Sequence, residues 1–199
     1  MGKVTLFENA GDAQKLAESL RKTATKQSSG GEIFMKFTKG GEFLMGAESN
    51  EVGPDERWAV NPSSFMSGVI GWEDGSVAGE EMYSVMSGKQ VDWDALPTIP
   101  PGEGNGWSEQ MSVQLKSLDE DIEVLFKTSS NGGRSALAEL AGEIGKQLHT
   151  NPEAPVAVVS LTNDPYKHKR YGKINKPKFV IEGWLDANGE PVKAQRKLV

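Results

Sequence analysis

Two apolar runs that frame a cationic loop, between residues 155 and 186, place the strongest constraint on the fold. The first run, Pro155–Thr162, carries no charge and is rich in β-branched residues, and the second, Phe179–Trp184, is also mainly apolar. Each is therefore expected to form a strand. Asn163-Asp164-Pro165 supplies turn residues after the first run. Between Tyr166 and Lys178 the chain holds Lys167, Lys169, Arg170, Lys173, Lys176 and Lys178 and no acidic residue.

The cationic loop stands out because the chain as a whole has a net charge of -6. Aromatic rings are interleaved with the cations at Tyr166, His168 and Tyr171. A local concentration of positive charge on an acidic protein indicates a polyanionic ligand. The alternative is a solvated hairpin whose lysines maintain solubility.

Charge also divides along the chain. From Glu48 to Glu123 there are 16 acidic and 3 basic residues, a balance of -13, and the remainder has 12 acidic and 19 basic residues, a balance of +7. This distribution disfavours indiscriminate phosphate binding and leaves one face attractive to it. The absence of cysteine excludes disulfides and thiolate sites, and two histidines are too few for a histidine-rich metal cluster. No metal or cofactor is expected.

The sequence contains no run approaching the roughly 20 apolar residues of a membrane helix, and no secretory signal. A cytoplasmic protein that does not contact membranes is expected. Asp12 is placed to cap an amphipathic helix that runs to about Thr25, and Ser28-Ser-Gly-Gly31 forms a flexible break after it. The expected organisation is an N-terminal helical extension, residues 1–27, followed by one domain, residues 28–199.

Within that domain, alternating apolar residues predict a series of strands and turns. They are residues 32–39 and 42–46 joined by Gly40-Gly41, residues 66–72 turned at Glu73-Asp74-Gly75, and the pair 107–118 and 122–127. Residues 135–149 have the apolar spacing of a helix, and the two strands of the first paragraph follow. Pro97–Gly106 is expected to be a long surface loop, mobile or functional. The predicted fold class is mostly β (α+β), a five-stranded antiparallel barrel like the oligonucleotide/oligosaccharide-binding (OB) fold, with a helix before the last two strands and an N-terminal helix.

Four residues outside the cationic loop are candidates for contact with bases. Phe34 and Lys36 share one face of the first hairpin, where a ring beside a cation forms a stacking platform. Trp58 and Trp72 are also large enough to stack on bases, although a tryptophan in a strand can instead anchor the core.

Five segments carry a resemblance to a known family. They are Trp58-x-Val-Asn-Pro-x-Ser-Phe65, Gly68-x-Ile-x-Trp72-x-Asp-Gly75, Gly79-Glu-x-Met82, Tyr166-Lys-His-Lys-x-Tyr-Gly-Lys173 and Pro177-x-Phe-x-Ile-x-Gly-Trp184. Together they resemble phage-encoded single-stranded DNA-binding proteins, a divergent group of barrel proteins. The resemblance implies DNA replication or recombination in a bacteriophage, in the host cell cytoplasm, with replication or recombination proteins as partners. Proteins of this class commonly end in an acidic recruiting tail, whereas this chain ends Val192-Lys-Ala-Gln-Arg-Lys-Leu-Val199.

The functional hypothesis is binding of single-stranded DNA without strong sequence preference, through phosphate neutralisation and base stacking. This is a binding protein, not an enzyme, and self-association into a homo-oligomer is left open. The predicted DNA-binding residues are Phe34, Lys36, Trp58, Trp72, Tyr166, Lys167, His168, Lys169, Arg170, Tyr171, Lys173 and Lys176. One alternative is a metal-dependent nuclease or other DNA-processing enzyme, because carboxylates lie near basic residues in the sequence. Another is an acidic protein-interaction module.

Overall fold

The computed structural model describes residues 31–170 and 172–192. The chain divides between Glu32 and Ile33, and the elements below belong to the second unit, Ile33–Val199. The expected N-terminal helix and the domain boundary after residue 27 lie outside the described residues, as does Tyr171.

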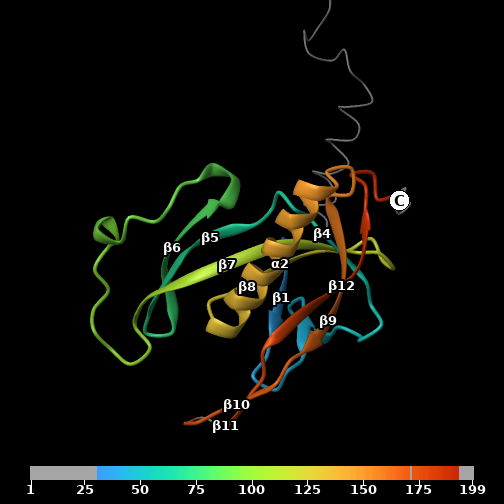
Figure 1. Ribbon diagram of the computed structural model, residues 1–199. Coiled ribbons are helices and arrows are strands. Elements are labelled where there is room, and N and C mark those ends of the chain that lie inside the picture. Colours follow the sequence, from blue (N-terminus) through green and yellow to red (C-terminus); the bar gives the residue numbers. More distant parts are fainter. Residues whose placement is uncertain (1–30, 171, 193–199) are drawn as a thin grey trace, which may run out of the picture. The chain divides into compact units, whose positions relative to one another are not determined.

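Strand β7 (Gly106–Ser117) is the strand around which the sheet is built (Figure 1). Along one edge it pairs with β8 (Glu123–Thr128). Its other edge is shared by β4 (Trp58–Val60), which pairs with the end of β7, and β5 (Met66–Glu73), which pairs with its beginning. Residues 61–65 interrupt this edge, because Pro62 has no N–H to donate to a ladder.

The interruption splits the sheet into two branches. From β4 the sheet continues to β9 (Val156–Asn163) and β12 (Pro177–Leu185). From β5 it continues, within the described part of the chain, to β6 (Ser76–Ser84) alone. Two short 3-10 turns, η1 (Val85–Ser87) and η2 (Trp93–Ala95), follow β6.

On the far side of β8 lie β1 (Ile33–Phe37), β2 (Phe43–Met45) and β3 (Asn50–Glu51). The β1–β2 hairpin is confirmed, with Phe37 opposite Phe43. Between β9 and β12 the chain forms a separate two-stranded sheet, β10 (Tyr166–His168) and β11 (Gly172–Ile174). Among the described residues the main sheet has ten strands.

The predicted five-stranded antiparallel OB-like barrel is wrong. The chain is mostly β, as expected, but its sheet is mixed and forms a half-barrel. Strand β1 runs parallel to β8, with Ile33 opposite Val124. Hydrophobic alternation identifies strands, but it carries no information on which strands pair or in which direction.

The α-helix of the described residues, α2 (Asn131–Thr150), begins four residues before the predicted start. Ser130 caps it, because its Oγ accepts a hydrogen bond from the N–H of Gly133 at 3.1 Å. Gly133 belongs to the helix because the helix begins tightly against β8, where a Cβ on Gly133 would lie 2.2 Å from Thr128 Oγ1. Gly133 therefore permits close packing of the start of α2 against β8.

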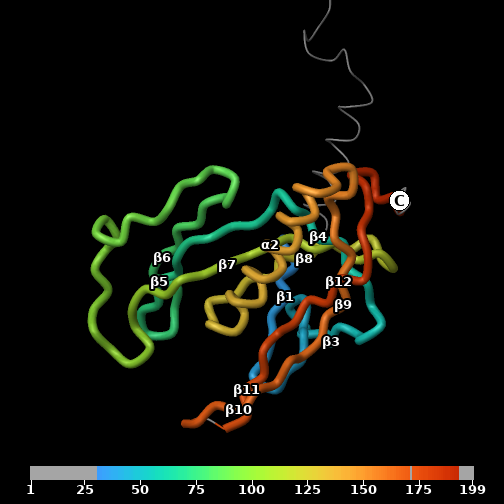
Figure 2. The backbone as a smooth tube through the Cα atoms, in the orientation of Figure 1, coloured from blue at the N-terminus to red at the C-terminus, as the bar shows by residue number. Residues whose placement is uncertain are grey.

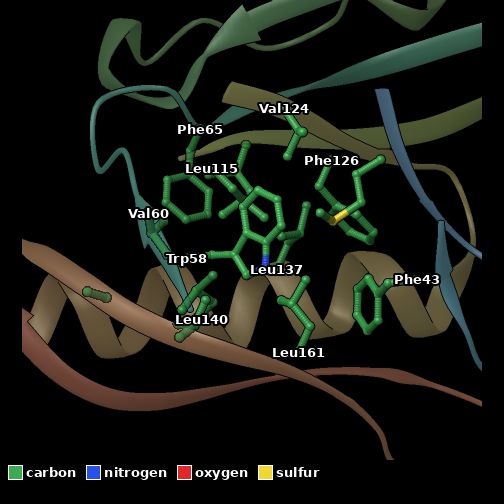
Figure 3. Close-up of a cluster of buried hydrophobic side chains, with 14 of the residues drawn as sticks. Phe43, Trp58, Val60, Phe65, Leu115, Val124, Phe126, Leu137, Leu140 and Leu161 are labelled. Atoms are coloured by element: carbon green, nitrogen blue, oxygen red, sulfur yellow. The ribbon is translucent and has the colours of Figure 1, made fainter. Parts of the chain in front are cut away.

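A cluster of buried side chains fills the half-barrel between the sheet and α2 (Figure 3). Four of these side chains, Trp58 of β4, Leu115 of β7, Phe126 of β8 and Leu137 of α2, are at most 1% exposed. Leu137, Leu140 and Ile144 recur at helical spacing and present one face of α2 to this cluster. Burial of these apolar surfaces is the main stabilising contribution to the fold.

Aromatic rings close the side of the half-barrel that no backbone ladder joins. The sheet order places β12 at one edge and β2 near the other. The ring of Phe179 on β12 lies 6.0 Å from that of Phe43 on β2 and 5.3 Å from that of Phe126 on β8. The two ends of the curved sheet thus meet through edge-to-face rings.

The Pro97–Gly106 loop packs on the β5–β6 branch. Trp107 donates from Nε1 to the carbonyl of Pro97 at 2.8 Å. Its indole lies over Gly71 and Gly79, which are neighbours across β5 and β6, and a Cβ on Gly79 would come within 2.9 Å of the ring. The loop therefore packs against a surface formed by two glycines and one tryptophan.

We expect Leu137→Ala to lower the free energy of unfolding by about 3 kcal/mol, because it leaves a cavity at the centre of the core. Leu148→Ala on the same helix is the matched control, since Leu148 is 39% exposed. It should change stability by no more than about 0.5 kcal/mol. Urea denaturation of both variants measures the difference, and equal effects would contradict the packing described for α2.

Candidate nucleic-acid interface

The cationic loop forms the β10–β11 ribbon, which projects beyond the ends of β9 and β12 (Figures 1 and 2). In its register, Tyr166 lies opposite Ile174, Lys167 opposite Lys173, and His168 opposite Gly172. Because side chains alternate along a strand, Lys167 and Lys173 share one face, and Tyr166 with His168 shares the other. The ribbon thus has a cationic face and an aromatic face.

The tip of the ribbon carries Lys169 and Arg170. The backbone N–H of Arg170 donates to Nδ1 of His168 at 3.2 Å, which ties the tip to β10. Gly172 opens β11 with φ of +74°, a left-handed conformation that glycine adopts without strain.

Two asparagines attach the base of the ribbon to the β1–β2 turn. Asn175 Nδ2 donates to the carbonyls of Lys39 and Gly40, both at 2.8 Å, and its Oδ1 accepts from Asn163 Nδ2 at 2.9 Å. Gly41 lies directly beneath, where a Cβ would be 2.3 Å from Asn163 Nδ2. A two-stranded ribbon is only marginally stable by itself, so these bonds anchor it.

The ribbon lysines differ in their partners. No ion pair joins Lys167, Lys169 or Lys173 to an acidic side chain among the described residues. Lys176, beyond the ribbon, pairs instead with Glu139 of α2 at 2.7 Å. The pKa of Glu139 is lowered mainly by this hydrogen bond from Lys176. Lys176 therefore fastens the end of β11 to the helix, a structural role that the sequence did not predict.

The structure places Phe34 and Lys36 on the outer face of β1. Phe34 is 50% exposed, and Nζ of Lys127 on β8 lies 5.9 Å from the centre of its ring. Lys127 also pairs with Glu80 at 2.5 Å, while Lys36 donates to Ser49 Oγ at 3.2 Å. An exposed ring flanked by two lysines can stack on a base.

The two tryptophans are not part of this surface. Trp58 is 0% exposed, so its prediction as a base-stacking residue is wrong; it packs in the core as β4 passes between β7 and β9. Trp72 is partly buried at the end of β5, opposite Gly106, on the branch that leads to β6. The structure thus brings together the ribbon residues and separates them from both tryptophans.

Lys39 belongs beside the ribbon and was missed by sequence reasoning. It is exposed in the β1–β2 turn, and its carbonyl accepts the hydrogen bond from Asn175 at the base of the ribbon. Lys39 and Asn175 are 136 residues apart in the sequence. No spacing pattern could have indicated this contact.

The ribbon projects from the sheet (Figure 1), and two hollows lie elsewhere on the described surface. A groove of about 450 Å³ lies between α2 and β12, with Leu140, Phe179 and Ile181 among its lining residues. A second hollow, of about 420 Å³, lies where α2 begins, against β5 and β7. The described residues of the ribbon, 166–170 and 172–174, line neither of these two hollows.

The part of the chain that the structure describes contains no cluster of three His, Cys, Asp or Glu side chains arranged to hold a metal ion. Nor does that part include a helix with the length and apolar character needed to cross a membrane. The chain matches no protein-family model, no curated protein and no solved structure.

We expect Asn175→Ala to loosen the ribbon by removing its donor to two backbone carbonyls. Local opening should become easier by about 1–3 kcal/mol. Hydrogen exchange measured by mass spectrometry should quicken in peptides covering residues 38–41 and 163–176 and stay unchanged in α2. Asn188→Ala, in the turn after β12, is the control, and faster exchange of the ribbon in that variant as well would contradict the anchoring role.

Proposed function

We propose that this protein binds single-stranded DNA with little sequence preference and that the β10–β11 ribbon is the primary contact. The observation that carries the proposal is the cross-strand pair Lys167 and Lys173. Like charges directly opposite each other destabilise an antiparallel pair of strands. No acidic side chain among the described residues forms an ion pair with Lys167 or Lys173. A line of phosphates along the cationic face would relieve this repulsion and release counterions.

The aromatic face supports a single strand as the ligand. Tyr166 is 47% exposed, and its neighbour across the ribbon is the aliphatic Ile174. Unpaired bases offer their faces for stacking, whereas bases in a duplex are covered by their neighbours. Stacking does not depend on base identity, which agrees with weak sequence preference.

The path of the strand extends from the ribbon to the turn that anchors it. Lys39 contributes a further cation at the base, and Lys36 with Phe34 lies on the strand that leads into that turn. The binding role in phage DNA replication or recombination that the sequence resemblance implies belongs to the same proposal. The nuclease alternative gains no support from the described carboxylates, which are not gathered at the ribbon.

Replacing Lys167 and Lys173 together with alanine tests the cationic face. We expect the double variant to bind a fluorescently labelled oligo-dT more weakly. The slope of log affinity against log salt should become shallower by about 1.4, because each lost phosphate contact removes about 0.7. Fluorescence anisotropy at several salt concentrations measures both. The control replaces Lys89 and Lys116, which removes the same charge elsewhere. Equal losses in the two double variants would show that net charge alone matters.

Tyr166→Ala tests the aromatic face. If a base stacks on this ring, affinity for oligo-dT should fall by about 1–3 kcal/mol while the salt slope stays the same. Tyr166→Phe should retain most of the affinity, because stacking needs the ring and not the hydroxyl. A loss of affinity in Tyr166→Phe equal to that in Tyr166→Ala would indicate that the hydroxyl, not stacking, is the contact.

A further inference from the structure

Strand β6 ends its branch of the sheet with an unpaired edge. Among the described residues its nine residues, Ser76–Ser84, pair with β5 alone. The hydrogen bond from the N–H of Val85 to the carbonyl of Phe65 extends the pairing with β5 by one residue before η1 begins. No described strand pairs with the outer side of β6. Backbone groups along the outer side of β6 are therefore available to a further strand.

Lysine and proline, which commonly protect such an edge, are absent from β6. Proteins commonly place lysine or proline on an exposed edge strand, or keep it very short. β6 is nine residues long and contains neither residue type. A register shift leaves Ala78 as an extra residue near its start, and Gly79–Ser84 pair regularly with β5. Val77 on the strand is 56% exposed and Met86 just beyond it is 75% exposed. An edge of this kind is suited to strand addition by a partner.

The surroundings of β6 specify the charge of that partner. Residues 73–109 hold eight acidic residues and one lysine, Lys89. Two of the acids pair with cations outside this range, Glu80 with Lys127 and Glu109 with Arg134, and the remaining six still outnumber Lys89. Glu81 lies on the same face of the branch as Trp107, and its Oε1 accepts a hydrogen bond from the hydroxyl of Tyr83 at 2.7 Å. Two residues earlier, at Gly79, the strand has no side chain and the indole of Trp107 reaches across it. The edge thus presents an apolar position and an acidic position in succession on one face.

Pairing of β6 with β6 of a second copy is disfavoured. Glu80 and Glu81 lie at the middle of the strand, so a symmetric antiparallel arrangement would set carboxylates against carboxylates. The excess of acid throughout residues 73–109 adds to this repulsion. The complementary partner is a different, cationic chain.

We infer that β6 is a docking edge for an extended, basic segment of a partner protein, which adds to the sheet as a strand. The segment places an apolar side chain opposite Gly79, against Trp107, and a Lys or Arg side chain opposite Glu81. Backbone hydrogen bonds to the edge supply affinity, and these two positions supply specificity. The β10–β11 ribbon, the primary DNA contact proposed above, lies on the other branch of the sheet from β6. Glu80 of β6 pairs with Lys127, whose Nζ lies over the Phe34 ring, so β6 adjoins the Phe34 surface.

A labelled peptide with the sequence Thr-Lys-Thr-Leu-Thr-Lys-Thr-Lys-Thr is the probe, and fluorescence anisotropy with the full chain is the measurement. The peptide should bind, and methylation of its backbone nitrogens at alternate residues should abolish binding for one alternating set and spare the other, because only one set faces β6. Charge alone cannot distinguish the two methylated peptides. Absence of binding, or equal binding by both methylated forms, would overturn strand addition.

Glu81→Lys should lower the affinity for the peptide by about fivefold or more, because the substitution replaces a cross-strand attraction with a repulsion. Asp94→Lys is the matched control, since Asp94 is exposed in η2 and outside β6. It should bind the peptide nearly as well as the unaltered chain. Oligo-dT binding should be unchanged in Glu81→Lys, which separates this edge from the proposed DNA site. Equal losses of peptide binding in both variants, or sedimentation showing self-association that Glu81→Lys abolishes, would overturn the assignment.

Discussion

Burial of one aromatic and aliphatic cluster between the curved sheet and α2 is the interaction on which the rest of this structure depends. The described strands do not close into a complete barrel by hydrogen bonds, and side chains bridge the gap between the edges. Phe179 meets Phe43 and Phe126 across the gap, and Leu137 fills the centre from the helix. With the two edges held this way, β9 and β12 can extend beyond the core and carry the β10–β11 ribbon.

The fold separates charges that a small protein could otherwise neutralise locally. The basic ribbon emerges from the β9–β12 branch, while the acidic residues of 73–109 accompany the β5–β6 branch. Segregation of this kind gives the surface two regions of opposite potential. A polyanion and a polycation are each attracted to one region and repelled by the other, which suits two ligands that do not compete.

Local patterns were read correctly where one short segment decides the outcome. The β1–β2 and β7–β8 hairpins, the apolar face of α2 and the strands on either side of the cationic loop follow from alternation and helical spacing. Trp58 was misassigned because an aromatic side chain has the same appearance in sequence whether it stacks on a ligand or fills a core. The start of α2 was misplaced because Gly133, which normally disfavours a helix, is needed there for contact with Thr128.

The sequence by itself determined the composition of the ribbon, the acidic character of the middle segment and the existence of most strands, because each of these depends on neighbouring residues. Only the tertiary structure decided which strands pair, that β1 runs parallel to β8, and that Lys39 lies beside Asn175. The same holds for the projection of the cationic ribbon from the sheet and for the pairing of β6 with β5 alone among the described strands. These outcomes depend on contacts between distant segments, and such contacts are selected by the packing of the whole core, for which no local pattern carries a signal.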